Sequence, residues 1–239
     1  MAKVPEKKFA PRRKMCIIVD EYGDYGEVPK KQPNGKYRPT KTVGFGVSVI
    51  RNKSAYLDIY DDIRRVSGAK GEMKGAKVKD PMRRREISKK IQNSGALTYG
   101  YNIDKDRSDI PKYWHSVKSN NERVVRTLGS TMEHVLDKRR MNEATVIIDR
   151  HDAYKDCSKK LNATVIPKNW DLAKKVVKDV ADKKNMKIKV SIVSSGANND
   201  YAHLIQVNDF VTNSVYRHTE LGDKTDTKLM NTRVRRLKR

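Results

Sequence analysis

The stretch MCIIVDEYGD, residues 15–24, decides how the rest of the chain is interpreted. Residues 15–19 are all apolar and three of them are Ile or Val, which predicts a buried β-strand that ends at a glycine turn. Two carboxylates, Asp20 and Glu21, stand where this strand stops. Successive strand residues point to opposite faces, so only one of the two can face a given site, and Asp20 still belongs to the strand. Such an acid either ends in open water or faces a cation or a hydrogen-bond donor.

A second stretch repeats this pattern. Residues 145–149 read Thr-Val-Ile-Ile-Asp, which predicts another core strand that ends in a carboxylate, Asp149. If the two strands are neighbours and run in the same direction, Asp20 and Asp149 emerge at one edge of the sheet, where open α/β sheets bind ligands. His151 and Asp152 follow directly. A lone histidine is more often a surface or core residue than a functional one, so both interpretations of His151 stay open.

Two further stretches offer acids. In Gly71-Glu72-Met73-Lys74-Gly75 the glycines permit a close approach of backbone or substrate, and Glu72 and Lys74 face the same way if the stretch is extended. In residues 204–211 an apolar helical stripe has Gln206 and Asp209 on a neighbouring face. Asp is a poor helix former among hydrophobic residues. The alternative for Asp209 is the solvated face of an amphipathic helix.

Strand and helix patterns alternate through the chain. Further strands are predicted at 43–50, 96–103 and 188–193, and helices at 80–94, 121–138, 171–184 and 200–217, whereas 55–65 fits either a strand or a helix. This alternation predicts one α/β domain with a mixed sheet over residues 15–222. Residues 1–14 and 223–239 are basic and read as terminal arms outside the core.

The charge of the chain points to a polyanionic partner. There are 53 Lys and Arg against 29 Asp and Glu, a net charge of +24. Nucleic acid is the commonest polyanion, and the solubilising lysines of proteins from hot environments are usually balanced by Glu. The basic residues that we predict to contact nucleic acid are Lys30, Lys31, Lys36, Arg38, Arg83, Arg84, Arg85, Arg235 and Arg236.

The sequence indicates neither a zinc site or disulfide framework nor a segment that enters a membrane. Cys16 and Cys157 form no zinc-type spacing and make a poor disulfide framework, which fits a reducing cytoplasm. No apolar run approaches the roughly twenty residues of a membrane span. The basic N-terminus is not followed by the apolar segment of a secretory signal. We therefore expect a cytoplasmic protein that does not enter membranes.

The order of these motifs resembles a known family. The Asp20-Glu21 pair with Gly23-Asp24, and the later Gln206-x-x-Asp209, are similar to the uncharacterised domain family numbered 3800, which is similar to ribonuclease-H-like nucleases. The resemblance covers residues 15–217, and Asp149 matches the family's middle Asp, which follows an apolar strand. Tyr22 stands where the family usually has a small residue. It implies a ribonuclease-H-like α/β fold, a mixed β-sheet flanked by helices.

The resemblance also implies a chemistry. Metal-dependent nucleases use two divalent ions to activate water and to stabilise the attacking and leaving oxygens, and hard ions such as Mg²⁺ or Mn²⁺ take carboxylate ligands. The implied catalytic and metal-binding residues are Asp20, Glu72, Asp149 and Asp209. The candidate accessory residues, from the resemblance and from the motifs above, are Glu21, Asp24, Lys74, His151, Asp152 and Gln206. The substrate would be RNA, DNA or a hybrid.

Two alternatives stay open. A junction resolvase or transposase-like enzyme of the same fold would use the same carboxylates on branched DNA, and would need a dimer. A non-catalytic basic protein would bind nucleic acid and use its acids only in salt bridges. A nucleotide enzyme finds no support, because neither GxxxxGK[ST] nor GxGxxG occurs in the sequence.

Overall fold

The computed structural model describes residues 14–25, 30–31, 37–38, 40–67, 74–117, 119–137, 141–151 and 170–238. Within these residues six strands form one mixed sheet in the order β7-β6-β1-β4-β5-β8. Their bounds are β1 Lys14–Tyr22, β4 Thr42–Ile50, β5 Leu97–Asp104, β6 Glu143–Asp149, β7 Lys187–Val193 and β8 Arg233–Arg236. Strands β1, β4 and β5 are antiparallel neighbours, β6 and β7 run parallel to β1, and β8 runs parallel to β5. The short strands β2 (Lys30–Lys31) and β3 (Tyr37–Arg38) form a separate pair.

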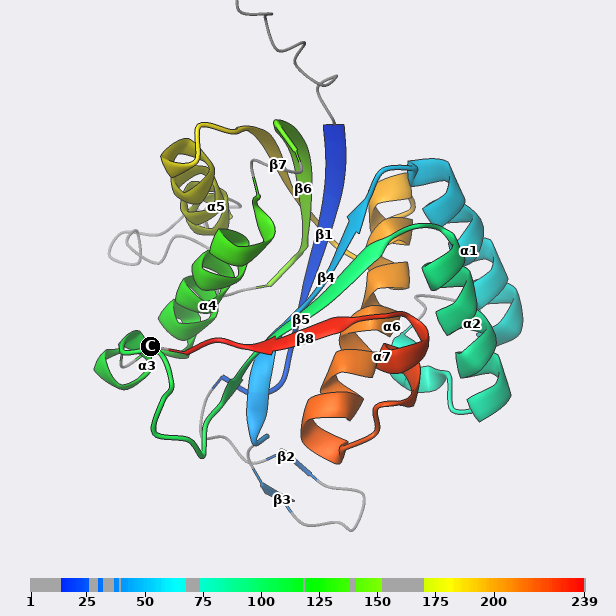
Figure 1. The fold of residues 1–239 in the computed structure, drawn as a ribbon, viewed down its shortest axis with the longest axis horizontal. Helices are drawn as coiled ribbons and strands as arrows, with labels where there is room; N and C mark the ends of the chain where they lie inside the picture. The colour runs from blue at the N-terminus through cyan, green and yellow to red at the C-terminus, as the bar shows by residue number, and fades with distance from the viewer. Residues whose placement is uncertain are drawn as a thin grey trace, which may run out of the picture.

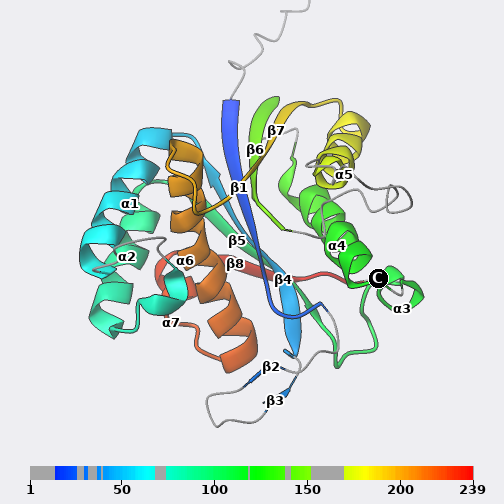
Figure 2. The same ribbon diagram turned by 180° about the vertical axis from the view of Figure 1, so that it is seen from behind.

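Helices cover both faces of this sheet. The helices are α1 Lys53–Ser67, α2 Pro81–Asn93, α3 Tyr113–Ser116, α4 Asn120–Val135, α5 Asp171–Lys183, α6 Asp200–Leu221 and α7 Thr225–Leu229, with the short 3₁₀ turn η1 at Gly75–Lys77. Helices α4 and α5 lie on one face and α1, α2 and α6 on the other (Figure 1; Figure 2 shows the same layers from behind). The chain is thus an α/β domain with a mixed sheet flanked by helices, as predicted.

The central strand β1 is buried because both of its faces are apolar. Ile17 and Val19 pack in the hydrophobic cluster under α4 and α5, whereas Ile18 packs in the cluster under α1, α2 and α6. Continuous apolar runs are typical of strands that are covered on both faces. Asp20 is the next residue on the α6 side, and it ends the apolar run at the point where the site lies.

The sequence signals for helix ends agree with the structure. Asp80 caps α2 by accepting a hydrogen bond from Met82 N, and Pro81 is the first helical residue. Asn199 caps α6 by accepting from Ala202 N, and Gly222, with φ 75°, ends that helix four residues later than predicted. The segment that fitted either a strand or a helix is helix α1.

Helix α6 is fixed against the sheet along its length. The Asn208 amide, inside the helix, donates to Gly46 O at 3.1 Å and accepts from Ser48 Oγ at 2.6 Å. The Glu220 carboxylate, near the end of the helix, accepts from the backbone N–H of Lys41 at 2.9 Å and from that of Thr42 at 2.8 Å. A Cβ on Gly46 would lie 2.5 Å from Cα of Thr212 on α6, so a glycine is required for this close contact. These contacts hold α6 and its Asp209 in a defined position.

The prediction of a basic C-terminal tail over residues 223–239 is wrong. Helix α7 and strand β8 fall within it, and β8 pairs with β5 from Tyr99↔Arg233 to Asn102↔Arg236. Leu237 is buried in the core, and its N–H donates to Asn102 O at 2.7 Å. The sequence conceals this strand because three of its four residues are arginines and only single apolar residues, Val234 and Leu237, anchor it. At the other end, residues 1–13 lie outside the described residues and Lys14 begins β1.

Within the part of the chain that the structure describes, no helix combines the length and the apolar character that crossing a bilayer requires.

Candidate carboxylate site

Two core strands bring Asp20 and Asp149 to the same edge of the sheet. Strands β1 and β6 are parallel neighbours and pair up to Val19↔Ile148, so Asp20 and Asp149 are the next residue of each strand. Ile18 and Ile147 both pack in the cluster beneath α6. Because side chains alternate along a strand, the acids two positions later face the same layer. The condition on which the sequence placed Asp20 and Asp149 at one edge, parallel neighbouring strands, is therefore met.

Helix α6 adds Asp209 from above this edge. Its Oδ2 accepts a hydrogen bond from the backbone N–H of Gly75, and its Oδ1 lies 3.9 Å from Lys74 Nζ. A Cβ on Gly75 would lie 2.6 Å from Phe210 Cα, so only glycine lets the backbone approach the helix this closely. Asp209 is therefore half-buried and engaged rather than part of a solvated face.

The charges of these carboxylates act on one another. Asp20 is 6% exposed, and its pKa is raised well above the usual range, first by burial and then by the charges of Glu21, Asp209 and Asp149. The charge of Lys74 works in the opposite direction. No described residue donates a hydrogen bond to the Asp20 carboxylate. A buried carboxylate that lacks a partner and is surrounded by other acids is a strong attractor for a cation.

Glu21 lies on the opposite face of β1, next to His151. Its Oε1 is 3.7 Å from His151 Nε2, and its Oε2 is buried without a hydrogen-bond partner among the described residues. The pKa of Glu21 is raised to about 8, first by burial and then by the charge of Asp149. The strand end thus carries buried acids on both faces, and Glu21 and His151 form a pair of their own.

A chain of hydrogen bonds holds Asp149 in place. Its Oδ1 accepts from Arg150 N at 2.8 Å and from Ser195 N at 3.2 Å, in the turn that follows β7. The buried Gln206 amide on α6 donates to Ser195 O at 2.7 Å. Gln206, predicted as an accessory residue, therefore positions the turn that binds Asp149. The contribution of Ser195 comes from its backbone and has no sequence signal.

The remaining predicted acids are more distant or are not described. Asp24 follows the Gly23 turn (φ 84°), where its N–H donates to Thr40 Oγ1 at 2.7 Å and its carbonyl accepts from Lys105 Nζ at 3.0 Å. Glu72 and Asp152 lie outside the described residues. Of the four predicted metal ligands, the structure brings together Asp20, Asp149 and Asp209.

The predicted basic contacts differ in how exposed they are and in whether their side chains are described. Arg83, Arg85 and Arg235 are exposed, and Arg236 is half-buried with its guanidinium 2.9 Å from Asp109 Oδ2. Lys36 lies outside the described residues, and for Lys30, Lys31 and Arg38 only the backbone is described, in β2 and β3. The exposed residues can reach a phosphate backbone.

Arg84 is a correction to the predicted nucleic-acid contacts. It is 3% exposed, and its Nε donates to Asp226 Oδ2 at 2.6 Å. Its Nη1 donates to Gly75 O at 2.9 Å and to Val78 O at 3.0 Å. The side chain points inward from α2 because its guanidinium can donate several hydrogen bonds at once, to the buried Asp226 carboxylate and to these two carbonyls. Arg84 thus holds the segment whose Gly75 N–H binds Asp209.

The donor chemistry of the site fits a hard divalent cation. The acids that the structure places at the α6-side edge offer carboxylate oxygens, and no described residue donates a hydrogen bond to the buried Asp20. Within the described ranges, no group of three or more His, Cys, Asp and Glu side chains is arranged so that it could hold one metal ion. Mg²⁺ keeps several of its waters and needs only one or two carboxylates, so pairs of these acids are sufficient ligands.

Without divalent ions, the buried acids should make the protein less stable as the pH rises. The pKa of Glu21 moves from an ordinary 4.5 to about 8 on folding. Between these values the folded protein keeps a proton that the unfolded chain has released. The free energy of unfolding therefore falls across this window, by at most about 1.4 kcal/mol per pH unit for each such group. Urea unfolding in EDTA between about pH 5 and pH 8 should give a flatter pH profile for Glu21→Gln than for the parent. Equal slopes would show that Glu21 is already ionised in this range.

Comparison with known proteins adds no assignment to this site. No family model matches the chain, and a search of curated proteins found no similar sequence. The resemblance to family 3800 therefore stays a prediction.

Proposed function

We propose that the chain is a divalent-metal-dependent nuclease that hydrolyses phosphodiester bonds at the carboxylate site. The observation that carries this proposal is Asp20, a buried carboxylate with no described hydrogen-bond donor, at the end of the central strand and facing the charges of Asp149 and Asp209. A structural role would require a cationic or hydrogen-bonding partner, because buried carboxylates are costly without one.

The sheet order supports the same proposal. An antiparallel meander, β1-β4-β5, is extended on the β1 side by the parallel strands β6 and β7. This arrangement agrees with the ribonuclease-H-like fold that the resemblance implies. The acids then stand at the carboxyl ends of β1 and β6, where α/β folds commonly place their ligands.

In this proposal Asp20, Asp149 and Asp209 hold Mg²⁺ or Mn²⁺, with Glu72 as a further ligand. When bound, such ions activate water and stabilise the charge on the attacking and leaving oxygens. Gln206 and Gly75 position the acids through the hydrogen bonds described above. Lys74, 3.9 Å from Asp209, places a positive charge where a phosphate would approach. The basic surface of a +24 protein holds the nucleic-acid backbone and thereby positions the scissile bond.

The test is a cleavage assay with labelled RNA, DNA, hybrid and branched DNA substrates, each with Mg²⁺, Mn²⁺ or EDTA. We expect cleavage of at least one substrate with the metals and none in EDTA. Cleavage confined to branched DNA would favour the resolvase alternative. Tight binding without metal-dependent cleavage of any substrate would instead leave a non-catalytic nucleic-acid-binding protein.

Metal binding should also stabilise the fold. A ligand that binds only the native state, at about a hundred times its Kd, adds about 2.7 kcal/mol, or roughly 5–10 °C in Tm for a chain of this size. We expect this rise with Mg²⁺ or Mn²⁺ in the parent, and a smaller one in Asp149→Asn and Asp209→Asn. Asp179→Asn, an exposed acid on α5, is the matched control and should keep the full rise. Equal shifts in all four proteins would place the ions elsewhere.

A further inference from the structure

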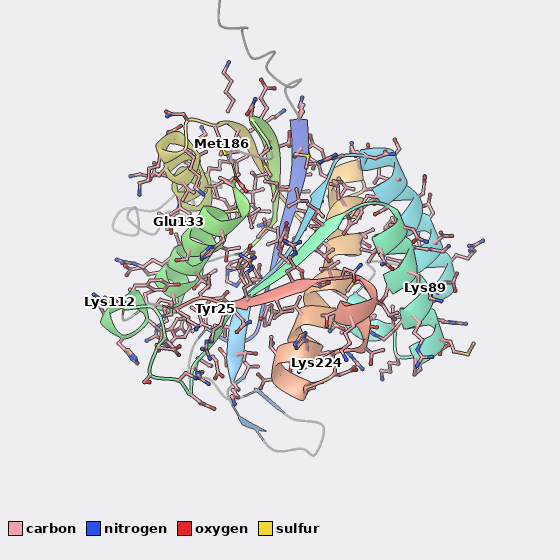
Figure 3. The ribbon with its side chains drawn as sticks, in the orientation of Figure 1. Tyr25, Lys89, Lys112, Glu133, Met186 and Lys224 are labelled. Carbon is pink, nitrogen blue, oxygen red and sulfur yellow. The ribbon has the colours of Figure 1, made fainter. Side chains whose placement is uncertain are left out.

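A surface pocket lies where three distant segments of the chain meet, apart from the carboxylate edge. Its volume is about 590 Å³, and it is formed by the start of α3, one side of α4 and the residue after Leu237. The lining side chains that matter here are three cations and three hydroxyls, Lys112, Arg126, Lys238, Tyr113, Ser116 and Ser130. Figure 3 labels Lys112 beside α3.

The pocket contains positive charge and no lining carboxylate. Lys112, Arg126 and Lys238 are all exposed, and no described carboxylate pairs with either lysine. Arg126 pairs with Glu122 one turn earlier on α4, at 2.7 Å, but both side chains are about half exposed. Such surface pairs contribute little, so a stronger anion can compete for the guanidinium. Three cations around one hollow attract an anion.

The backbone at the two lysines is held by ordered structure. Lys238 follows Leu237, whose side chain is buried and whose N–H donates to Asn102 O at 2.7 Å. Lys112 follows the buried Pro111, whose carbonyl accepts from Trp114 N at 2.9 Å. The Tyr113 hydroxyl donates to Thr127 Oγ1 at 3.2 Å, which fixes its ring against α4. The pocket is thus formed before any ligand arrives, which limits the entropy lost on binding.

We infer that this pocket binds a phosphate group of the nucleic-acid backbone. Three cations, Lys112, Arg126 and Lys238, around one hollow match the negative oxygens of a phosphate, whereas a metal ion would require acids. The inference rests on the proposed function in one respect, that nucleic acid is the substrate. It adds a contact that anchors the strand through the end of β8 and through α4.

The experiment is binding of labelled single-stranded RNA and DNA across a salt series in EDTA. The test variant combines Lys112→Gln, Arg126→Gln and Lys238→Gln. The control combines Lys175→Gln, Lys178→Gln and Lys183→Gln on α5, which removes the same charge from exposed positions. Each lost phosphate contact lowers the slope of log K against log salt by about 0.7–0.9, so we expect the pocket variant to lose about 2 in slope and about tenfold in affinity relative to the control.

Two results would overturn the inference. Equal salt slopes and affinities in the two triple variants would show that the pocket does not touch the backbone. Calorimetry with inorganic phosphate distinguishes a free phosphate from a phosphate of the nucleic-acid backbone. If the pocket variant loses phosphate binding, but binds oligonucleotides as well as the control variant does, the ligand is a free phosphate. Binding in EDTA is measured without relying on cleavage, so this inference and the nuclease proposal can fail independently.

Discussion

Replacing Asp20 by Asn should abolish metal-dependent cleavage while the protein still binds nucleic acid. The substitution keeps the shape of the side chain and removes one negative charge from the centre of the carboxylate site. Loss of a charge that holds the metals costs several kcal/mol of transition-state stabilisation, which corresponds to about a thousandfold or more in rate. Single-turnover cleavage at saturating protein measures this effect without interference from substrate affinity.

The control for Asp20→Asn is Asp179→Asn, the same chemical change at an exposed position of α5. Binding in EDTA should be similar in both variants and in the parent, because the basic surface is unchanged. In the absence of metal, Asp20→Asn should unfold at the same or a higher urea concentration, since it removes an acid whose ionisation is disfavoured in the folded protein by burial and by the neighbouring carboxylates. Cleavage at the parental rate would show that the site is wrongly assigned.

The largest effect on stability is expected for Arg84→Met. Arg84 and Asp226 are both nearly fully buried, and Met leaves the Asp226 charge without its main partner. Breaking a buried ion pair in this way typically costs about 3–5 kcal/mol. The substitution also removes the donor to Gly75 O and Val78 O, so the segment that binds Asp209 loses a support. Urea unfolding measured by circular dichroism gives the free energy of unfolding.

Arg83→Met is the matched control for Arg84→Met. Arg83 is the preceding residue of α2, is exposed, and pairs with Asp80 at 3.4 Å, an interaction worth about 0–1 kcal/mol. The double variant Arg84→Met with Asp226→Leu removes both charges, and should recover part of the lost stability. If Arg84→Met is no less stable than Arg83→Met, the buried pair does not hold these elements together.

The apolar runs made the central features of the fold predictable. Residues 15–19 and 146–148 have the unbroken hydrophobicity of strands covered on both faces, and the acids after them mark where each strand leaves the core. From the sequence, the parallel pairing of these two strands was only a condition for bringing the two acids together, and the structure shows that the strands do pair in parallel. Asp80 with Pro81, and Asn199, also carried usable signals, because capping depends on the local sequence.

The features that sequence reading missed depend on contacts between distant segments. Arg84 looks like its neighbours Arg83 and Arg85, and only the position of Asp226 on α7 explains why it points inward. The glycines of residues 71–75 predicted a close approach of backbone or substrate, but only the structure shows that Gly75 makes it and that its N–H binds Asp209. Strand β8 has too few apolar residues to stand out within a basic segment. Its pairing is set by the free edge of β5.

The pairing of β8 with β5 has a consequence for the order of events during synthesis. Asn102 and Arg235 touch across the two strands but are 133 residues apart in the chain. At about 5–20 residues per second, translation leaves about 7–27 seconds between the emergence of the two strands. If the meander forms as it emerges, the edge of β5, with Tyr99 and Tyr101, has no strand beside it during that interval. An unpaired strand edge invites pairing with other chains, so the yield of native protein should depend on how fast residues 233–237 arrive.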